Sequence, residues 1–287
     1  MNIVAYGGGT NSTAMLIGLC RKQIPVDLIL FSDTGGEHPH TYGYFPIING
    51  WLAAHGMPEI TRLEYRTREG LRLTLEQECL QSHSLPSIAY GYKSCSLKHK
   101  VHPQEKYCNH HPACREAWKR GEKINKFIGY DAGEGRRKKR AEDAERKDKK
   151  YNYQYPLIEW GWSRDDCIEA IRQEGLPLPG KSSCFFCPSM RPKEIRTLYH
   201  RHRDLYERAV AIEREAKPYL TVVKGLGRNW AWEDFVEADA NQIVLPNFFP
   251  EDNLPCGCYS EEDAGWPRPL IRGKTHALSF GGSGDSL

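Results

Sequence analysis

The first residues of the chain place a glycine-rich turn between a strand pattern and a helix pattern. The run Asn2–Tyr6 is mostly apolar and favours a strand. It leads into Gly7-Gly-Gly-Thr-Asn-Ser-Thr13, after which apolar residues recur at helical spacing. Glycines let the backbone approach a phosphate closely, and the free N–H groups and dipole of a helix N-terminus hold an anion. The sequence therefore predicts a phosphate cradle and a bound nucleotide.

Two common phosphate-binding loops do not match this turn. A P-loop needs a lysine after its second glycine, and none stands there. A Rossmann fingerprint needs Gly or Ala where this chain has Ser12, and an acidic residue about twenty positions further on. Asp33 lies near that distance, but in the different setting Phe31-Ser-Asp-Thr-Gly35. A glycine-rich turn without a ligand is the alternative.

Strand and helix patterns alternate along the first half of the chain. Strand patterns cover residues 2–6, 26–31, 60–65 and 124–130, and helix patterns cover residues 12–22, 41–55, 69–82 and 135–148. This alternation predicts an α/β fold, with a parallel sheet that helices flank on both faces. Ligands of such sheets bind at the carboxyl ends of the strands, where residues 7–12 and 33–37 fall.

The 287 residues suffice for one large domain with an appendage. We expect a nucleotide-binding domain over residues 1–190 and a C-terminal helical and irregular extension over residues 191–287. Ser163 is a suitable N-cap for a helix that follows it. A long helix is expected over about 191–216, because Pro218 would stop it, and irregular chain with a flexible tail would follow.

Charge and hydropathy bear on whether the chain enters a membrane or binds a polyanion. The formal net charge is +3, and no run of about eighteen apolar residues could cross a membrane. The sequence opens directly on a strand pattern, so we expect no signal peptide and a cytoplasmic protein. Basic residues gather over 136–150 and again over 191–203. They indicate either solvated faces or contacts with the phosphates of a nucleotide or a nucleic acid.

Ten cysteines without a signal peptide indicate metal binding or catalysis rather than disulfides. Cys184-Phe-Phe-Cys187 has the spacing that lets two thiolates meet one metal ion or one edge of a cluster. Cys95 begins a basic helix pattern, and a helix N-terminus with nearby lysines favours its thiolate form. A structural zinc ion on these thiols, or a redox-active disulfide between Cys184 and Cys187, is the alternative.

The other cysteines carry weaker signals. Cys108-Asn-His-His-Pro-Ala-Cys114 contains zinc-ligand residue types, but at an uncommon spacing. Cys20, Cys79 and Cys167 lie in helix patterns, and we expect them to be small buried apolar residues.

Four segments resemble a known superfamily. Gly7–Ser12 stands at the six places of the pyrophosphate loop of adenine-nucleotide alpha-hydrolases, usually Ser-Gly-Gly-x-Asp-Ser, with Gly in place of Ser and Asn in place of Asp. Asp33–Glu37, Ile128–Arg137 and Tyr155–Asp166 resemble, in the same order, elements of phosphoadenosine-phosphosulfate (PAPS) reductases. The resemblance covers roughly residues 1–190 and implies a PAPS-reductase-like, pyrophosphate-loop fold.

Such a resemblance implies cleavage of ATP between its α and β phosphates, which gives an adenylated intermediate and pyrophosphate. Backbone N–H groups, arginines and Mg²⁺ would stabilise the developing pyrophosphate. Ser12, Cys95 and Arg136 are the residues implied in catalysis, and Asp33 would bind the nucleoside. The implied nucleotide-binding residues are Gly7, Gly8, Gly9, Thr10, Asn11, Ser12, Thr13, Asp33, Thr34, Gly129, Arg136 and Arg137.

The local match looks most like the ATP-pyrophosphatase component of DNA phosphorothioation systems. In sulfur-transfer members, a cysteine upstream of a Cys-x-x-Cys holds an iron–sulfur cluster, so Cys95, Cys184 and Cys187 are the implied ligands, with zinc as the alternative. Three ligands would leave one iron open to carry a sulfide, unless Cys256 or Cys258 supplies a fourth. The implied partners are nucleic acid, DNA rather than tRNA, and a cysteine-desulfurase-type sulfur donor, and a homodimer stays open.

Two other functions stay open beside nucleic-acid thiolation. A sulfonucleotide reductase shares the fold, but its C-terminal Glu-Cys-Gly-Leu-His motif is absent, and Cys95 stands alone where iron–sulfur reductases carry a Cys-Cys pair. A degenerate nucleotide-binding module without catalysis would explain the departures at Gly7 and Asn11.

Overall fold

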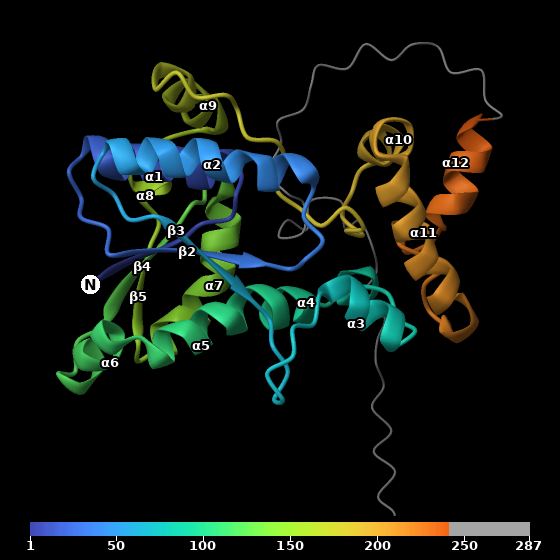
Figure 1. The fold of residues 1–287 in the computed structure, drawn as a ribbon, viewed down its shortest axis with the longest axis horizontal. Coiled ribbons are helices and arrows are strands. Elements are labelled where there is room, and N and C mark those ends of the chain that lie inside the picture. The colour runs from blue at the N-terminus through green and yellow to red at the C-terminus, as the bar shows by residue number, and fades with distance from the viewer. Residues whose placement is uncertain (241–287) are drawn as a thin grey trace, which may run out of the picture.

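A parallel sheet forms the centre of the fold (Figure 1). The computed structural model describes residues 1–240, without the side chains of residues 140–144 and 240. In that range five strands pair in parallel in the order β3-β2-β1-β4-β5. Their bounds are β1 Asn2–Ala5, β2 Leu28–Asp33, β3 Ile60–Glu64, β4 Ile124–Ile128 and β5 Tyr151–Gln154. The expected α/β class with a parallel sheet is confirmed.

The direction of chain progression reverses between β1 and β4. From β1 the chain moves outward to β2 and β3, and it then returns to the other side of β1 for β4 and β5. Such a reversal opens a crevice outside the carboxyl ends of the two neighbouring strands. Ala5 and Ile128 are partners at those ends, so the glycine-rich turn that follows β1 begins at this crevice.

The edge strand β5 was missed from the sequence. Tyr151–Gln154 reads Tyr-Asn-Tyr-Gln, which is too short to show a clear two-residue hydrophobic period. Its neighbour β4 determines its conformation, since Ile124 pairs with Tyr151 and Phe127 with Gln154. The other four strands lie where the patterns predict them, within a few residues at their ends.

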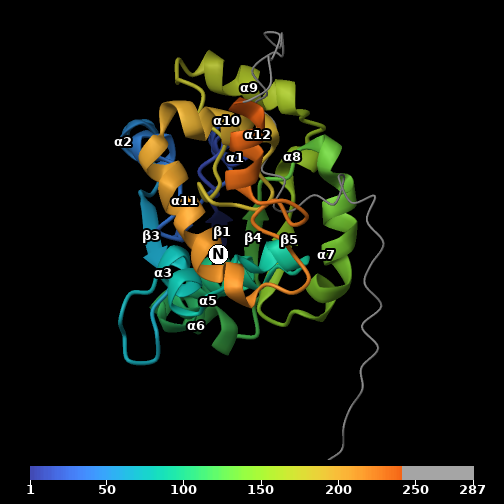
Figure 2. The same cartoon turned by 90° about the vertical axis from the view of Figure 1, so that its right-hand side faces the viewer.

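Helices cover both faces of the sheet (Figures 1 and 2). Val4 and Ile29 share a buried cluster with residues of α1, α2 and α9, whereas Ile3 and Leu30 share another with α5 and α6. This alternation follows from the two-residue period of a strand. No helix of the described residues is long and apolar enough to cross a membrane. The bounds are α1 Thr10–Arg21, α2 Pro39–Ala54, α5 His102–His110, α6 Pro112–Lys119, α7 Gly135–Lys147, α8 Pro156–Glu159 and α9 Arg164–Gln173.

The segment between β3 and β4 differs from its expected single helix over 69–82. Only α3 (Leu75–Gln81) is helical there, and the Thr74 hydroxyl caps it by accepting from the Gln77 N–H at 3.1 Å. The residues before it form a tight turn instead, in which the backbones of Arg66 and Arg72 pair in antiparallel fashion. A 3₁₀ turn, the short α4 (Ser94–Ser96) and a π-helical turn (Leu97–Val101) then lead into α5.

The expected long helix over 191–216 is wrong, because two helices stand there. α10 (Pro192–Arg201) ends at His202, whose backbone has φ −139° and ψ 59°, and α11 (Arg203–Ala216) begins beside it. Neither proline nor glycine marks the break in the sequence. The bend lets Leu198 and Tyr206, from different helices, enter one buried cluster.

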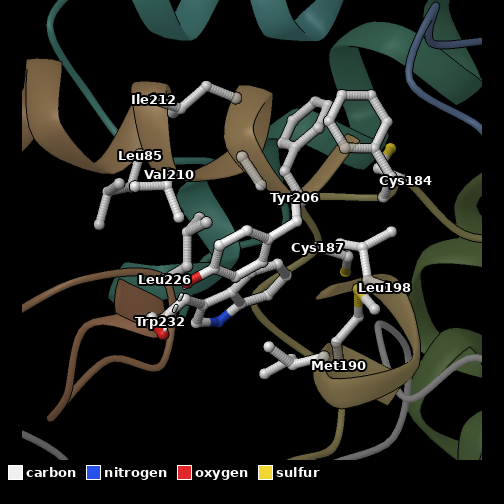
Figure 3. Packing of buried hydrophobic residues seen from close by; sticks show 14 of the residues in the cluster. Leu85, Cys184, Cys187, Met190, Leu198, Tyr206, Val210, Ile212, Leu226 and Trp232 are labelled. Carbon is white, nitrogen blue, oxygen red and sulfur yellow. Dashed lines mark hydrogen bonds between the residues drawn. The ribbon is translucent and has the colours of Figure 1, made fainter. Parts of the chain in front are cut away.

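That cluster extends across the expected domain boundary at residue 190 (Figure 3). Trp232, at the start of α12 (Trp232–Ala240), is fully buried among side chains of α11 and of the Cys184–Met190 segment. The buried Glu213 carboxylate accepts hydrogen bonds from the N–H groups of Leu226 (2.6 Å) and Trp232 (2.9 Å). The loop before α12 is thereby fixed to α11.

Candidate active site

A cavity of about 330 Å³ lies at the crevice between β1 and β4. This volume lies within the range of small-molecule sites. The glycine-rich turn, the ends of β1, β2 and β4, and segments 129–137 and 180–182 line it. The sequence-predicted residues among its lining are Gly7, Gly9, Thr10, Asn11, Ser12, Gly129 and Arg137.

The glycine-rich turn has the geometry of an anion site. Gly8 has φ +78°, a conformation that favours glycine, and Gly9 is the N-cap of α1. The Ser12 hydroxyl donates to the Gly9 carbonyl at 3.0 Å, which closes the turn. The first N–H groups of α1 consequently point out of the helix end toward the cavity.

Gly129 supports the turn from β4. A Cβ atom on Gly129 would lie 3.1 Å from both the backbone N and the Cα of Ser12. Only glycine lets the end of β4 approach the cradle this closely. Thr13 lies behind the turn rather than in the cavity lining, where its hydroxyl contacts the Tyr6 hydroxyl at 3.1 Å.

Asn11 joins the turn to two other segments. Its amide nitrogen donates to Asp131 at 2.9 Å and to Glu134 at 3.0 Å. Its amide oxygen accepts from Arg164 at 2.6 Å, and the other terminal nitrogen of Arg164 donates to the Thr10 hydroxyl at 3.0 Å. Two carboxylates and one guanidinium therefore surround the start of α1.

The cavity lining is strongly basic. Arg137, Arg164, Lys100 and Lys126 all contribute to it. Burial lowers the pKa of Arg164 and that of Lys126, because an apolar environment disfavours the charged form. Glu134 pairs with Arg137 and Glu37 with Lys100, so carboxylates balance part of this charge. The sequence-predicted Arg136 lies exposed on α7, outside the lining.

Asp33 lies outside the lining and is occupied by its own neighbours. Its carboxylate is fully buried, forms an ion pair with Arg62 and accepts from the Tyr42 hydroxyl at 2.8 Å and the Gly35 N–H at 2.8 Å. Burial followed by this carboxylate raises the pKa of Tyr42. These contacts shape the loop after β2 and assign Asp33 a structural role there.

Glu37 connects the cavity to the cysteines. Its fully buried carboxylate accepts from Lys100 at 3.1 Å and from the Ser182 hydroxyl at 3.3 Å. The Ser182 hydroxyl also donates to the Gly7 carbonyl of the cradle. The backbone of Glu37 pairs with that of Cys184. The chain that leads into the Cys-x-x-Cys pair is thus bonded to the glycine-rich turn through Ser182 and to Glu37 through Cys184.

The cysteines themselves are not part of the cavity lining and belong to the neighbouring buried cluster, or pack against it. The Cys184 thiol contacts the Thr34 hydroxyl at 3.2 Å, and the Cys187 N–H donates to the Cys184 carbonyl at 3.0 Å. Burial, reinforced by the charge of Glu37, raises the pKa of Cys184 to about 12. Cys95 packs against the same cluster, and the next residue, Ser96, lines the cavity.

No three His, Cys, Asp or Glu side chains within residues 1–240 surround a position for one metal ion. Cys95, Cys184 and Cys187 therefore share a neighbourhood without forming a closed single-ion site. No cysteine in this range forms a disulfide. The neighbouring Cys114 thiol lowers the pKa of Cys108. Cys256 and Cys258 lie outside the described residues.

Several site residues were not predicted from the sequence. Arg164 falls inside the segment Tyr155–Asp166 that carries part of the resemblance, so a signal for it existed. Glu37 is the last residue of another such segment. Lys100 and Lys126 have no local signal, because only the folded chain brings them to the crevice.

A scan of protein-family models finds none that matches this chain. A search of curated proteins likewise finds no match.

Proposed function

We propose that this protein is an ATP pyrophosphatase that activates an oxygen of a nucleic acid for sulfur insertion, with DNA favoured over tRNA. The observation that carries the proposal is the cavity with basic side chains over the glycine-rich turn, with the segment that leads into Cys184 bonded to that turn through the Ser182 hydroxyl. Neither feature alone indicates sulfur chemistry. Together they support a site in which a nucleotide phosphate and a sulfur nucleophile would meet.

ATP would bind with its phosphates at the head of α1. Free N–H groups of the first turn would hold the β and γ phosphates, and Arg164, Arg137 and Lys100 would neutralise their charge. Mg²⁺ prefers carboxylates together with phosphate oxygens, and Asp131 and Glu134 are the carboxylates beside the cradle.

The reaction would proceed by two displacements. The first would occur at the α phosphorus of ATP, and the second at the adenylated acceptor. An acceptor oxygen attacks the α phosphorus, and pyrophosphate leaves on the basic side of the cavity. A sulfur nucleophile then attacks the adenylated acceptor, and AMP leaves with the original oxygen. Preformed charges and N–H groups lower the barrier, because they stabilise the leaving pyrophosphate without reorganisation. An iron–sulfur cluster on the cysteines would supply a docking point for sulfur.

The surface beside the cavity suits a polyanion. The N-cap of α7, Glu134, and Arg137 in its first turn line the cavity. Arg136 and Lys139 are exposed along the same helix. A phosphate backbone would lie along this helix toward the cavity. The second basic block contributes less, because Arg196 pairs with Asp239 at 2.7 Å and Arg203 pairs with Glu207 at 2.7 Å.

One observation favours a second candidate, a nucleotide-binding module without turnover. The Asn11 amide occupies both Asp131 and Glu134, where the resembled superfamily places a carboxylate on the loop. If that arrangement persists with ATP bound, Mg²⁺ would lose its protein ligands. Binding without formation of AMP would identify this candidate.

A sulfur-incorporation assay tests the full proposal. The anaerobically purified chain would receive ATP, Mg²⁺, a cysteine desulfurase with radiolabelled cysteine, and either duplex DNA or tRNA. We expect label in DNA that depends on ATP and is lost in Cys95→Ala. The matched control is Cys20→Ala, which alters a half-buried thiol far from the cavity lining. Label in neither nucleic acid, with sulfite released from a sulfonucleotide, would identify the reductase instead.

A further inference from the structure

Two buried polar side chains in the cavity wall lack a hydrogen-bond partner. Lys126 of β4 is 7% exposed and Gln104 of α5 is 8% exposed, and both line the cavity. Among the described side chains, none forms a hydrogen bond or ion pair with the Lys126 ammonium or the Gln104 amide. The ammonium lies over the Tyr151 ring, 5.0 Å from its centroid. Neither polar end is cut off from accessible space, so the cavity is where a partner could reach both.

Such groups destabilise the fold unless a ligand pairs with them. Burial without a partner costs free energy, and it costs more for a charge than for an amide. Burial lowers the pKa of Lys126, and the charges of Glu105 and Asp148 oppose that shift without forming an ion pair with it. Lys100, in the same wall, already donates to Glu37 at 3.1 Å. Lys126 and Gln104 are therefore the two groups of this wall that await a partner.

These two side chains lie across the sheet from the head of α1. Alternate residues of a strand face opposite sides of a sheet. Ile124, two positions before Lys126, packs with residues of α5 and α6, whereas Phe127 packs with residues of α1. Lys126 is therefore on the face that α5 covers, where Gln104 also lies. A ligand group that meets Lys126 and Gln104 is distinct from phosphates at the N-terminus of α1.

The charge of Lys126 indicates which kind of acceptor group fits there. The proposed reaction brings an acceptor oxygen to the α phosphate of ATP. If that oxygen belongs to a phosphate, two anions must meet in one cavity, and a cation on the acceptor side offsets their repulsion. A base carbonyl is neutral and would leave the buried ammonium without a counter-charge. A phosphate group is therefore the better partner for Lys126.

We propose that Lys126 and Gln104 form a second anion subsite, which binds a phosphodiester of the nucleic-acid acceptor while the head of α1 holds the phosphates of ATP. This inference rests on the proposed function. The ammonium donates to one phosphate oxygen, and the amide N–H groups donate to another. Both residues lie outside the four segments that resemble the superfamily, so the resemblance assigns neither of them a role.

Binding of two dinucleotides tests the subsite without turnover. The full chain, saturated with α,β-methylene ATP and Mg²⁺, would be titrated with a thymidine dinucleotide that has a phosphodiester linkage and with one that has an uncharged methylphosphonate linkage. The unaltered chain should bind the phosphodiester at least about tenfold more tightly, as expected from one charge-assisted hydrogen bond. Lys126→Met should abolish this preference and Gln104→Leu should reduce it, while the affinity for the ATP analogue stays unchanged. The control Lys119→Met removes an exposed lysine of α6 and should keep the preference.

The comparison in the unaltered chain decides the matter even if Lys126→Met fails to fold. Equal binding of the two dinucleotides, or binding of neither, would overturn the assignment. A preference that survives in folded Lys126→Met would overturn it as well, and a loss of affinity for the ATP analogue there would assign Lys126 to the nucleotide instead. Dinucleotide binding requires no cleavage of ATP. Absence of AMP formation with the preference retained would therefore contradict the proposed function and leave the subsite in place.

Discussion

The guanidinium of Arg164 donates to the side-chain oxygen of Asn11 at 2.6 Å. This bond joins the N-terminus of α9 to the glycine-rich turn, although 153 positions of sequence separate the two residues. Arg164 is thereby held beside the place where phosphates would bind. Asn11 is also the position at which the resembled superfamily usually carries Asp, so the turn lacks a carboxylate charge there.

Replacing Arg164 with Ala should weaken ATP binding strongly. A charge-assisted hydrogen bond is worth about 1.5–3 kcal/mol, which corresponds to a loss of about 10- to 150-fold in affinity. Isothermal titration with a non-hydrolysable ATP analogue measures it. Arg172→Ala removes an exposed arginine from the same helix and should leave the affinity unchanged. Equal affinities for the two variants would remove Arg164 from the site.

The substitution Asn11→Asp should make stability depend on Mg²⁺. It replaces a donor with a third carboxylate beside Asp131 and Glu134, which should lower the free energy of unfolding by about 1–3 kcal/mol. Mg²⁺ should restore part of that loss, because three carboxylates can share a cation. Thermal melts with and without Mg²⁺ measure both effects. Asn109→Asp changes an exposed residue of α5 beside Lys150 and should respond to neither. A melting temperature of Asn11→Asp that ignores Mg²⁺ contradicts a metal site here.

Gly129→Ala should abolish the cradle while the fold persists. The added methyl group would press on the backbone of Ser12, so the turn must shift away from its anion-binding geometry. We expect a loss of ATP affinity of at least about tenfold, since about 1.4 kcal/mol suffices for that. Gly135→Ala is the matched control, because no atom lies within 4 Å of its added Cβ. Retained binding in Gly129→Ala would place the phosphates elsewhere.

Glu213 should make stability decrease as pH rises. Burial raises the pKa of its carboxyl above the unfolded value of about 4.3, although the N–H groups of Trp232 and Leu226 oppose that shift. The folded state then binds more protons than the unfolded state over a pH window that begins near 4 and extends upward. Within it, the stability of the unaltered chain relative to Glu213→Gln should fall as pH increases.

Denaturant melts at several pH values measure this difference. Glu207→Gln changes an exposed carboxylate on the same helix, and its difference from the unaltered chain should stay nearly flat. A difference for Glu213→Gln that grows with pH would mean that its folded-state pKa is lowered instead.

Local patterns predicted the elements that carry their own signal. β1, β2 and the turn to α1 follow from hydrophobic runs and glycines that lie next to one another in the sequence. The break between α10 and α11 at His202 could not be predicted, because packing of both helices on one cluster produces it. The same holds for Asp33, whose acidic side chain suggested a ligand contact but whose partner Arg62 comes from the neighbouring strand.

Formation of AMP tests the central claim most directly. The anaerobically purified chain would be incubated with Mg²⁺, DNA, a cysteine desulfurase with cysteine, and ATP labelled at the α phosphate; the labelled products would be separated with time and pyrophosphate measured alongside. The proposed chemistry predicts AMP and pyrophosphate in equal amounts, lost in Gly129→Ala and retained in Gly135→Ala. ADP with inorganic phosphate, or intact ATP at saturating binding, would contradict it.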